Sequence, residues 1–241
     1  MTKHPEASDS EEATMPEENG TFIIGIPIYQ GVDLLDVAAP FEIFSWMGEK
    51  WTDARQVRVY LIAETHVALL TRDGLQLVPH KTFDEVEELD LLWVPGGDPA
   101  ALAKMMQDRI YLDFLKTRSE CTTYVTSVCE GALLLASAGL LDGYEATTHW
   151  AFLPCLRKFH EIIIAEGYPR FIVSDKRETG GGLRVTGGGV SSGLDEALEL
   201  VRLIGGDDLA KQVQLVIQYY PKPPVDGEIP PWDTCPVPPL K

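Results

Sequence analysis

The stretch that decides the fold runs from Tyr124 to Leu141 and reads YVTSVCEGALLLASAGLL. The segment 122–128 is rich in β-branched and apolar residues, which predicts a buried strand. Small and apolar residues continue over 130–141 and predict a helix. Cys129 therefore stands on a corner where a strand ends and a helix begins.

Strand-like and helix-like segments alternate along the rest of the chain. This pattern predicts an α/β protein, an αβα sandwich with a flavodoxin-like, mostly parallel sheet. Functional sites of such sheets lie at the carboxyl ends of the strands. We expect strands over 21–29, 56–64, 89–97, 122–128, 170–175 and 182–188, a hairpin over 67–83, and helices over 36–47, 99–106, 109–119, 130–141, 148–159, 192–205 and 208–220.

Composition excludes several classes of partner. The chain has 241 residues and a formal net charge of −17, so a nucleic-acid backbone would be repelled. No apolar run approaches the ~20 residues of a membrane-spanning helix. No secretory signal is readable at the N-terminus. We expect a cytoplasmic protein that binds a small molecule and neither nucleic acid nor membrane.

Three segments differ in composition. Residues 1–20 are acidic and poor in large apolar residues, which predicts a disordered tail. Residues 21–220 carry the strand and helix patterns and form the predicted domain. Residues 221–241 are proline-rich and cannot form a helix or a central strand. This last segment is either a free linker, or a tail that docks on the surface or reaches a partner subunit.

The four cysteines lack metal-binding or redox-pair spacing, and an intracellular setting would keep them reduced. We interpret Cys121, Cys155 and Cys235 as structural. Cys129 fits a nucleophile elbow, in which a strand, a tight turn and a helix meet and Gly131 permits the turn. A helix N-terminus favours a thiolate. The alternative for Cys129 is a buried structural cysteine.

Two further features fall at predicted strand ends. Gly96 and Gly97 present amides that stabilise negative charge on a substrate, or they form an ordinary turn. Asp36 either caps the helix that follows it or exchanges a proton with the thiol. We expect Asp33 to be the solvated member of this acidic pair.

Other candidates come later in the chain. His149 begins a predicted helix, where it acts as a base or orienting residue, or only as a cap. The glycine-rich run 186–193 lacks the pattern of a phosphate loop and is interpreted as a wall of the site. No motif indicates a metal or an organic cofactor, and we expect none.

Taken in order, these features resemble the ThiJ/PfpI superfamily, which has a class I glutamine amidotransferase-like fold. The likeness extends over about 22–226 and is strongest to the isonitrile hydratase (cyclohexyl-isocyanide hydratase) branch. The segments that carry it are LLDVAAPFEIF, RDGLQLVPHKTF, LLWVPGG, YVTSVCEGALLLASAGLLDGYEATTHWA, VTGGGVSSGLDEALELV and QYYPKPPVDG.

The resemblance implies a homodimer and a set of site residues. It implies that Cys129 is the nucleophile and that Asp36 is the acidic residue beside the thiol. Gly96 and Gly97 match the family's backbone amide donors.

Two more residues are placed at the substrate pocket by the same resemblance. His149 matches a histidine near the site in many relatives, and Trp150 follows it. No acidic residue stands two positions after His149, so the resemblance does not extend to a glutaminase triad.

Glu130 is where the chain departs from the branch, whose members carry a threonine directly after the cysteine. A carboxylate at this position raises the pKa of the thiol unless it is protonated or points away. It also offers an additional acid–base group, so we include Glu130 among the catalytic candidates.

The resemblance implies hydration of a small isonitrile to an N-substituted formamide through a covalent cysteine intermediate. The alternatives are a glyoxalase-like or other cysteine-dependent enzyme, and a non-catalytic member that senses oxidation through Cys129. Sensor domains of this kind precede DNA-binding helices in transcription regulators, and we expect no such helices here.

Overall fold

A computed structural model describes residues 20–51, 56–179 and 181–239. The acidic tail predicted for residues 1–20 therefore lies, except for Gly20, outside the described residues. Within the described ranges, no helix combines the length and the apolar character needed to cross a membrane.

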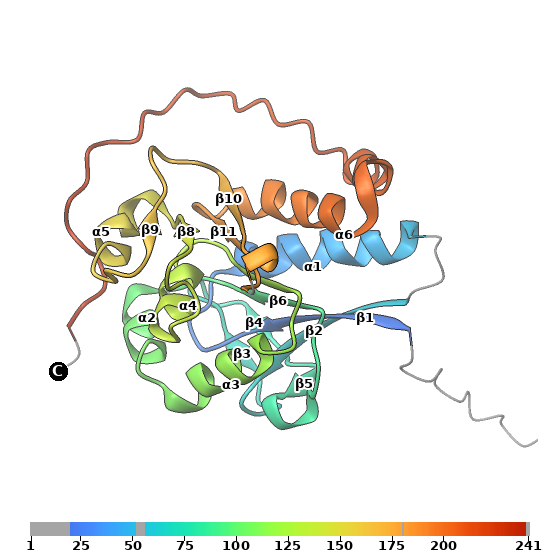
Figure 1. Ribbon diagram of the computed structural model, residues 1–241, viewed down its shortest axis with the longest axis horizontal. Helices are drawn as coiled ribbons and strands as arrows, with labels where there is room; N and C mark the ends of the chain where they lie inside the picture. The colour runs from blue at the N-terminus through green and yellow to red at the C-terminus, as the bar shows by residue number, and fades with distance from the viewer. Residues whose placement is uncertain (1–19, 52–55, 180, 240–241) are drawn as a thin grey trace, which may run out of the picture.

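One seven-stranded sheet organises the molecule (Figure 1). All neighbouring strands in it are parallel except the pair β10–β11, which is antiparallel. The strands, in spatial order, are β10 (Phe171–Asp175), β11 (Leu183–Gly187), β7 (Tyr124–Ser127), β6 (Leu91–Val94), β1 (Thr21–Pro27), β2 (Gln56–Ala63) and β5 (Lys81–Thr82).

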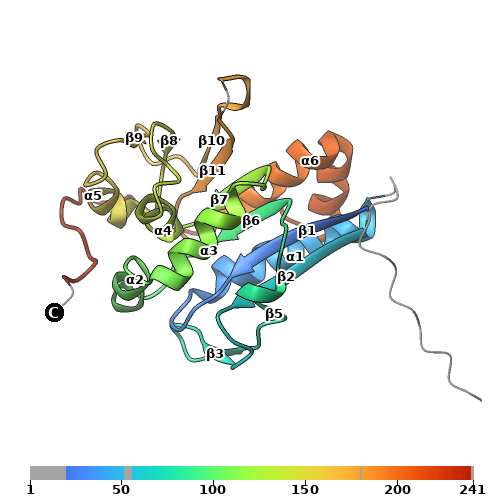
Figure 2. The ribbon, with the colours of Figure 1, turned by 60° about the horizontal axis from the view of Figure 1, so that its bottom comes forward.

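Helices cover both faces of this sheet, as Figures 1 and 2 show. The long helices α1 and α6 pack against each other on one face, and α2, α3 and α4 lie on the other. This confirms the predicted αβα sandwich. The helices are α1 (Leu34–Lys50), α2 (Pro99–Met105), α3 (Arg109–Ser119), α4 (Gly131–Ser137), α5 (Leu153–Leu156) and α6 (Ser192–Val216).

The central strands are apolar because both of their faces are covered. All four residues of β6 are buried, and Trp93 within it is fully enclosed. The Trp93 indole donates a hydrogen bond of 2.9 Å to the backbone carbonyl of Asp36, and its ring packs edge-on against Phe44. The sheet therefore fixes the first turn of α1, which carries Asp36.

Some predicted elements have different limits in the structure. The hairpin expected over 67–83 is a short antiparallel pair, β3 (Leu69–Leu70) and β4 (Gln76–Leu77). The chain then continues into β5, which pairs in parallel with β2. A second small sheet joins β8 (Glu145–Ala146) to β9 (Ile163–Ile164).

The predicted helices also differ in extent. The helix expected over 148–159 is a 3-10 turn at Trp150–Phe152 followed by the short α5, with Pro154 in its first turn. The helix expected over 130–141 ends at Ser137. The last two predicted helices are joined into α6, with a break at Gly206, whose φ of 85° is not helical.

A disulfide joins Cys155 of α5 to Cys235 of the proline-rich tail, 80 residues further along the chain. The expectation that all cysteines are reduced and separate was therefore wrong for this pair. Cys121 and Cys129 remain free thiols. The tail leaves the end of α6 and runs back to the α5 side of the molecule (Figure 1), where the disulfide holds its end, while residues 221–234 are exposed.

Glu196 of α6 places a carboxyl group in the core. The side chain is fully buried, and neither carboxyl oxygen has a hydrogen-bond partner among the described residues. Burial, with a smaller contribution from Asp36, raises the pKa of Glu196 well above its ordinary value of 4.5. The Glu196 carboxyl is therefore protonated in the folded protein at neutral pH.

Substitution Glu196→Gln tests this protonation state. Above pH 4.5 the unfolded chain ionises Glu196 while the folded chain keeps its proton, so wild-type stability falls as pH rises. Gln does not titrate. Denaturant unfolding should show the variant gaining stability relative to wild type between pH 4.5 and neutral pH. A difference that stays constant with pH would mean that Glu196 is ionised in the fold.

Gly131 is required where α4 meets β6. A Cβ atom at this position would lie 2.0 Å from the carbonyl oxygen of Val94, a backbone atom that cannot turn away. The glycine therefore lets the elbow approach the neighbouring strand closely. Gly227 in the tail has no heavy atom within 4 Å of the equivalent position.

We expect Gly131→Ala to lower the free energy of unfolding by on the order of 1–3 kcal/mol, as overpacking in a core does. Gly227→Ala is the matched control and should leave stability unchanged. Urea unfolding of both variants measures the difference. Equal stability of the two would show that the elbow has room for a side chain.

Candidate active site

Cys129 occupies the turn between β7 and α4. Its φ of 55° is one of two positive values among the described non-glycine residues, a strained conformation typical of functional turns. The Cys129 amide donates to the Gly188 carbonyl at 2.8 Å, and the Thr148 hydroxyl donates to the Cys129 carbonyl at 2.7 Å. The elbow geometry predicted from the sequence is therefore present.

Three carboxyl groups converge on this thiol. Ligand atoms of Asp33, Asp36, Cys129 and Glu130 lie within 4.8 Å of one another, and all four residues are buried. The first two come from the start of α1, and the others come from the elbow. The sheet thus brings together all three predicted catalytic residues, with Asp33 as an addition.

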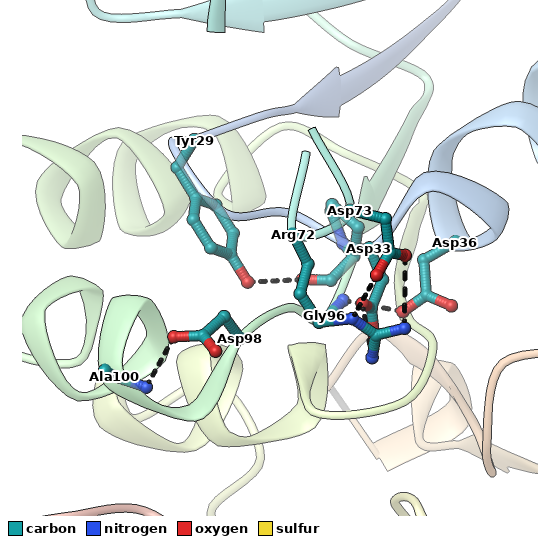
Figure 3. Close-up of polar contacts among 9 residues, drawn as sticks. Tyr29, Asp33, Asp36, Arg72, Asp73, Gly96, Asp98 and Ala100 are labelled. Atoms are coloured by element: carbon teal, nitrogen blue, oxygen red, sulfur yellow. Dashed lines mark hydrogen bonds and ion pairs between the residues drawn. The ribbon is translucent and has the colours of Figure 1, made fainter. Parts of the chain in front are cut away.

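Asp36 is held by its own hydrogen bond (Figure 3). Its Oδ2 accepts from the Gly96 amide at 2.9 Å, whereas Oδ1 has no hydrogen-bond partner among the described residues. The cap of α1 is Asp33, so Asp36 is a first-turn residue rather than the N-cap. The capping interpretation of Asp36 was wrong, and the carboxyl is free to face the thiol.

Glu130 points into the site instead of away from it. Its carboxyl lies near the Cys129 thiol and the Gly97 amide, and Oε2 has no hydrogen-bond partner among the described residues. A Cβ atom on Gly96 would lie 2.3 Å from Glu130 Oε2 and 3.0 Å from Asp36 Oδ2. Gly96 is therefore glycine because the two carboxyl groups close around it, and the amides of Gly96 and Gly97 both face carboxyl groups.

The cluster favours protonated forms. Burial raises the pKa of Asp36 well above its usual range, and Glu130 adds to the effect. Burial also raises the pKa of Glu130, to about 7. The pKa of the Cys129 thiol is raised well above its ordinary value by burial, and next by Asp36 and Glu130. Asp36 and the thiol thus keep their protons at neutral pH, and Glu130 is only partly ionised there.

The expectation that the elbow helix stabilises a thiolate was wrong for the resting site. α4 has only seven residues, and a helix dipole contributes about 0.3–1 kcal/mol. Desolvating an ion costs several kcal/mol, and two carboxyl groups oppose the negative charge. The Val190 amide acts in the other direction and lowers the pKa of Cys129, but its effect is smaller than those of burial and the two carboxyl groups.

Asp33 is buried, contrary to the expectation that it is solvated. Arg72 forms an ion pair with it at 3.0 Å, and Figure 3 shows Arg72 between Asp33 and Asp73. Burial raises the pKa of Asp33 and Arg72 opposes that rise. The sequence reasoning missed Arg72 because the RDG segment was interpreted only as a turn.

The four clustered side chains could also reach a single metal ion. A metal would have to displace protons from groups whose pKa values burial has raised. The donor set is thus better suited to holding protons than to holding a cation.

A pocket of about 410 Å³ opens beside the elbow. His149 and Trp150 line it on one side, and Gly188, Gly189 and Val190 line it on another. These glycines belong to the run that the sequence indicated as a wall of the site. His149 Nδ1 also accepts from the Ala151 amide, so this residue caps the 3-10 turn as well as lining the pocket. Burial lowers the pKa of His149, which favours the neutral ring.

The fold and this site define an αβα-sandwich protein with a cysteine at a strand–helix elbow and acidic groups around it. The model of the DJ-1/PfpI family matches residues 24–211, and the chain belongs to that family. This confirms the family expected from the motifs.

Individual relatives agree with the assignment. The isonitrile hydratase of Pseudomonas putida is 37% identical over 213 residues, which cover 88% of this chain and 84% of that protein. The crystal structure of a ThiJ/PfpI family protein from Pseudomonas syringae has a TM-score of 0.73 and 30% identity, covering 92% of this chain and 86% of that one.

A relative of another class is also similar. The HTH-type transcriptional regulator GbdR of Pseudomonas aeruginosa is 24% identical over 204 residues, covering 85% of this chain. Those residues are only 52% of the regulator. Membership of the family therefore does not by itself specify a reaction.

Glu130→Gln tests the electrostatic coupling within the cluster. Glu130 raises the pKa of Cys129 through its charge and through its contact with the thiol, so the substitution should lower that pKa. The rate of Cys129 alkylation, followed against pH by peptide mass spectrometry, should then reach its midpoint at a lower pH.

Glu88→Gln removes an exposed carboxyl away from the site and serves as the control. The control should have the wild-type profile. An unchanged profile for Glu130→Gln would show that Glu130 and the thiol do not interact.

Proposed function

We propose that this protein hydrates a small isonitrile to an N-substituted formamide, with Cys129 as the nucleophile. The observation that carries the proposal is the buried cluster in which Asp36 and Glu130 both face the Cys129 thiol. The 37% identity to an isonitrile hydratase over most of both chains supports the same reaction.

The two acids suit different proton transfers. Glu130, with a pKa of about 7, is partly ionised at neutral pH and accepts the thiol proton as sulfur attacks the terminal isonitrile carbon. Asp36 retains its proton under the same conditions and delivers it to that carbon. The product of this step is a thioimidate on Cys129.

Water then completes the reaction. It adds to the thioimidate carbon, and of its two protons one goes to the substrate nitrogen and the other restores Asp36. Glu130 returns the accepted proton to the Cys129 sulfur as the carbon–sulfur bond breaks. The thiol is regenerated and the N-formyl product leaves. The sum is one isonitrile and one water converted to one formamide.

The amides of Gly96 and Gly97 are consistent with this chemistry. Both face carboxyl groups, Gly96 that of Asp36 and Gly97 that of Glu130. They therefore orient the two acids, whereas an acyl-transfer site would direct such amides at a substrate oxyanion. Protonation of the isonitrile carbon requires a correctly oriented acid, whereas an oxyanion hole is not needed for it.

The redox-sensor alternative is less compatible with the geometry. Oxidation-sensing cysteines are exposed and have a low pKa, whereas Cys129 is buried and its pKa is raised. Methylglyoxal serves as the comparison substrate for the glyoxalase-like alternative.

Incubation with cyclohexyl isocyanide, with the formamide followed by chromatography, tests the reaction. Wild type should turn over, and Cys129→Ala should be inactive. Asp36→Asn should lose about 10²–10⁴-fold in kcat, as the loss of a general acid does. Cys121→Ser changes an exposed thiol and should keep full activity. Consumption of methylglyoxal without isocyanide turnover would exclude the proposal.

The pH profile gives a second test of the same roles. Activity should rise through about pH 7 as Glu130 loses its proton, and fall at higher pH when Asp36 ionises. Glu130→Gln should remove the rising limb. A profile that is flat from pH 6 to pH 8 in wild type would contradict the role of Glu130 as base.

A further inference from the structure

The proline-rich tail returns to the mouth of the pocket beside Cys129. Ile229 of this segment lines the pocket together with Leu35 and Val190 of the main domain. Three residues further on, Trp232 packs edge-on against Trp150, with 6.1 Å between ring centroids. We call residues 221–239 the C-terminal strap.

The strap is attached to the domain mainly through one covalent bond. Cys235 is joined to Cys155, and Val237 beside it packs against the core. The structure describes every residue from 221 to 239. Among the described residues, the side chains of this range form hydrogen bonds only with neighbours in the chain, at Trp232 and Thr234. No backbone hydrogen bond joins this range to a strand or helix.

The Cys155–Cys235 disulfide lies next to the site. Cys155 belongs to α5, which directly follows the 3-10 turn carrying Trp150 and capped by His149. The disulfide therefore holds the strap against the same part of the chain that forms the pocket wall. The bond keeps Cys235 at α5 and so limits how far Ile229, six residues before it, can move from the pocket mouth.

We propose that the C-terminal strap is the outer wall of the substrate pocket, and that Ile229 limits which substituent on the substrate fits. The Cys155–Cys235 disulfide holds this wall in place. The proposal rests on the proposed function in taking the pocket beside Cys129 as the substrate pocket.

The chemistry of the wall indicates the class of substituent. Ile229, Leu35, Val190 and Trp150 present apolar surface to the pocket, whose other lining residues include Arg170, Ser191 and Ser192. The apolar surface beside Ile229 favours an apolar organic group at that place. The substrate class is thus an isonitrile with a compact apolar substituent, its reactive carbon directed toward the elbow.

Reduction would release the strap. A dithiol gives two electrons and two protons to the disulfide, so that Cys155 and Cys235 become thiols and the dithiol closes to its cyclic disulfide. The segment then keeps only noncovalent contacts, among them the ring pair at Trp232 and the partly buried Val237, and it gains conformational freedom. The pocket then opens to larger molecules.

Alkylation of Cys129 tests the wall without relying on any enzymatic activity. The protein is treated with iodoacetamide or with the bulkier N-cyclohexylmaleimide, and the labelling of each cysteine is followed by peptide mass spectrometry. Cys121 is a free, exposed thiol in the same molecule and serves as the internal control.

A dithiol should raise the labelling rate of Cys129 by the bulky reagent several-fold relative to Cys121, with a smaller effect for iodoacetamide. Cys235→Ser should show the raised rate without dithiol, and dithiol should add nothing. If neither treatment changes the ratio of Cys129 to Cys121 labelling, the strap is not a wall of the pocket.

Two strap variants that keep the disulfide complete the test. Ile229→Ala should raise bulky-reagent labelling of Cys129 and increase kcat/KM for isonitriles larger than cyclohexyl isocyanide relative to that substrate. Val225→Ala, at an exposed strap position outside the pocket lining, should do neither. Equal behaviour of the two variants would overturn the role of Ile229.

The outcomes separate this proposal from the proposed function. If labelling depends on the strap but no isocyanide is turned over, the strap is a wall of the pocket and the proposed reaction is wrong. If isocyanide is turned over but labelling does not depend on the strap, the reaction stands and the strap is not a wall. If Cys235→Ser instead changes the oligomeric state in sedimentation, the strap is an arm between subunits and not a pocket wall.

Discussion

The site depends on one constraint, which is that a thiol and carboxyl groups share a space closed to water. Ligand atoms of Cys129, Asp36, Glu130 and Asp33 lie within 4.8 Å of one another. Fully ionised, this group would place four negative charges in the interior, which desolvation and repulsion forbid. Bound protons and the ion pair between Asp33 and Arg72 stabilise the arrangement.

The surrounding fold keeps that cluster together. Trp93 of the central strand binds the backbone of Asp36, and the Gly96 amide at the end of the same strand binds its carboxyl. Gly131 lets the elbow approach that strand, which brings Cys129 and Glu130 alongside. The parallel sheet thus supplies the geometry, and burial supplies the altered acidity on which the proposed reaction depends.

The family resemblance placed Asp36 beside the thiol, and local sequence patterns predicted the sheet, the elbow and the positions of Cys129, Gly96 and Gly97. Each of these lies where a strand ends, and the carboxyl ends of parallel strands meet at one edge of a sheet. The protonation state was not predictable in this way, because it depends on burial. The helix N-terminus suggested a thiolate, but desolvation and the carboxyl groups outweigh a helix of seven residues.

Contacts between distant segments were also beyond the sequence patterns. Arg72 reaches Asp33 only because the β3–β4 hairpin folds over the start of α1, so the expectation of a solvated Asp33 failed. Cys155 and Cys235 are 80 residues apart and have no motif spacing, so their pairing became visible only when the tail was placed against α5. Both errors came from judging residues by their local neighbours.

The most direct measurement of the central claim is the titration of the Glu130 side-chain carboxyl, followed by carbon-13 NMR. The account predicts a midpoint at about pH 7, since burial outweighs the contacts that stabilise the ion. A midpoint near roughly 4.3, the value of a carboxyl in water, would contradict it. In that case Glu130 would be an ordinary ionised side chain, and burial would not govern the acidity of the cluster.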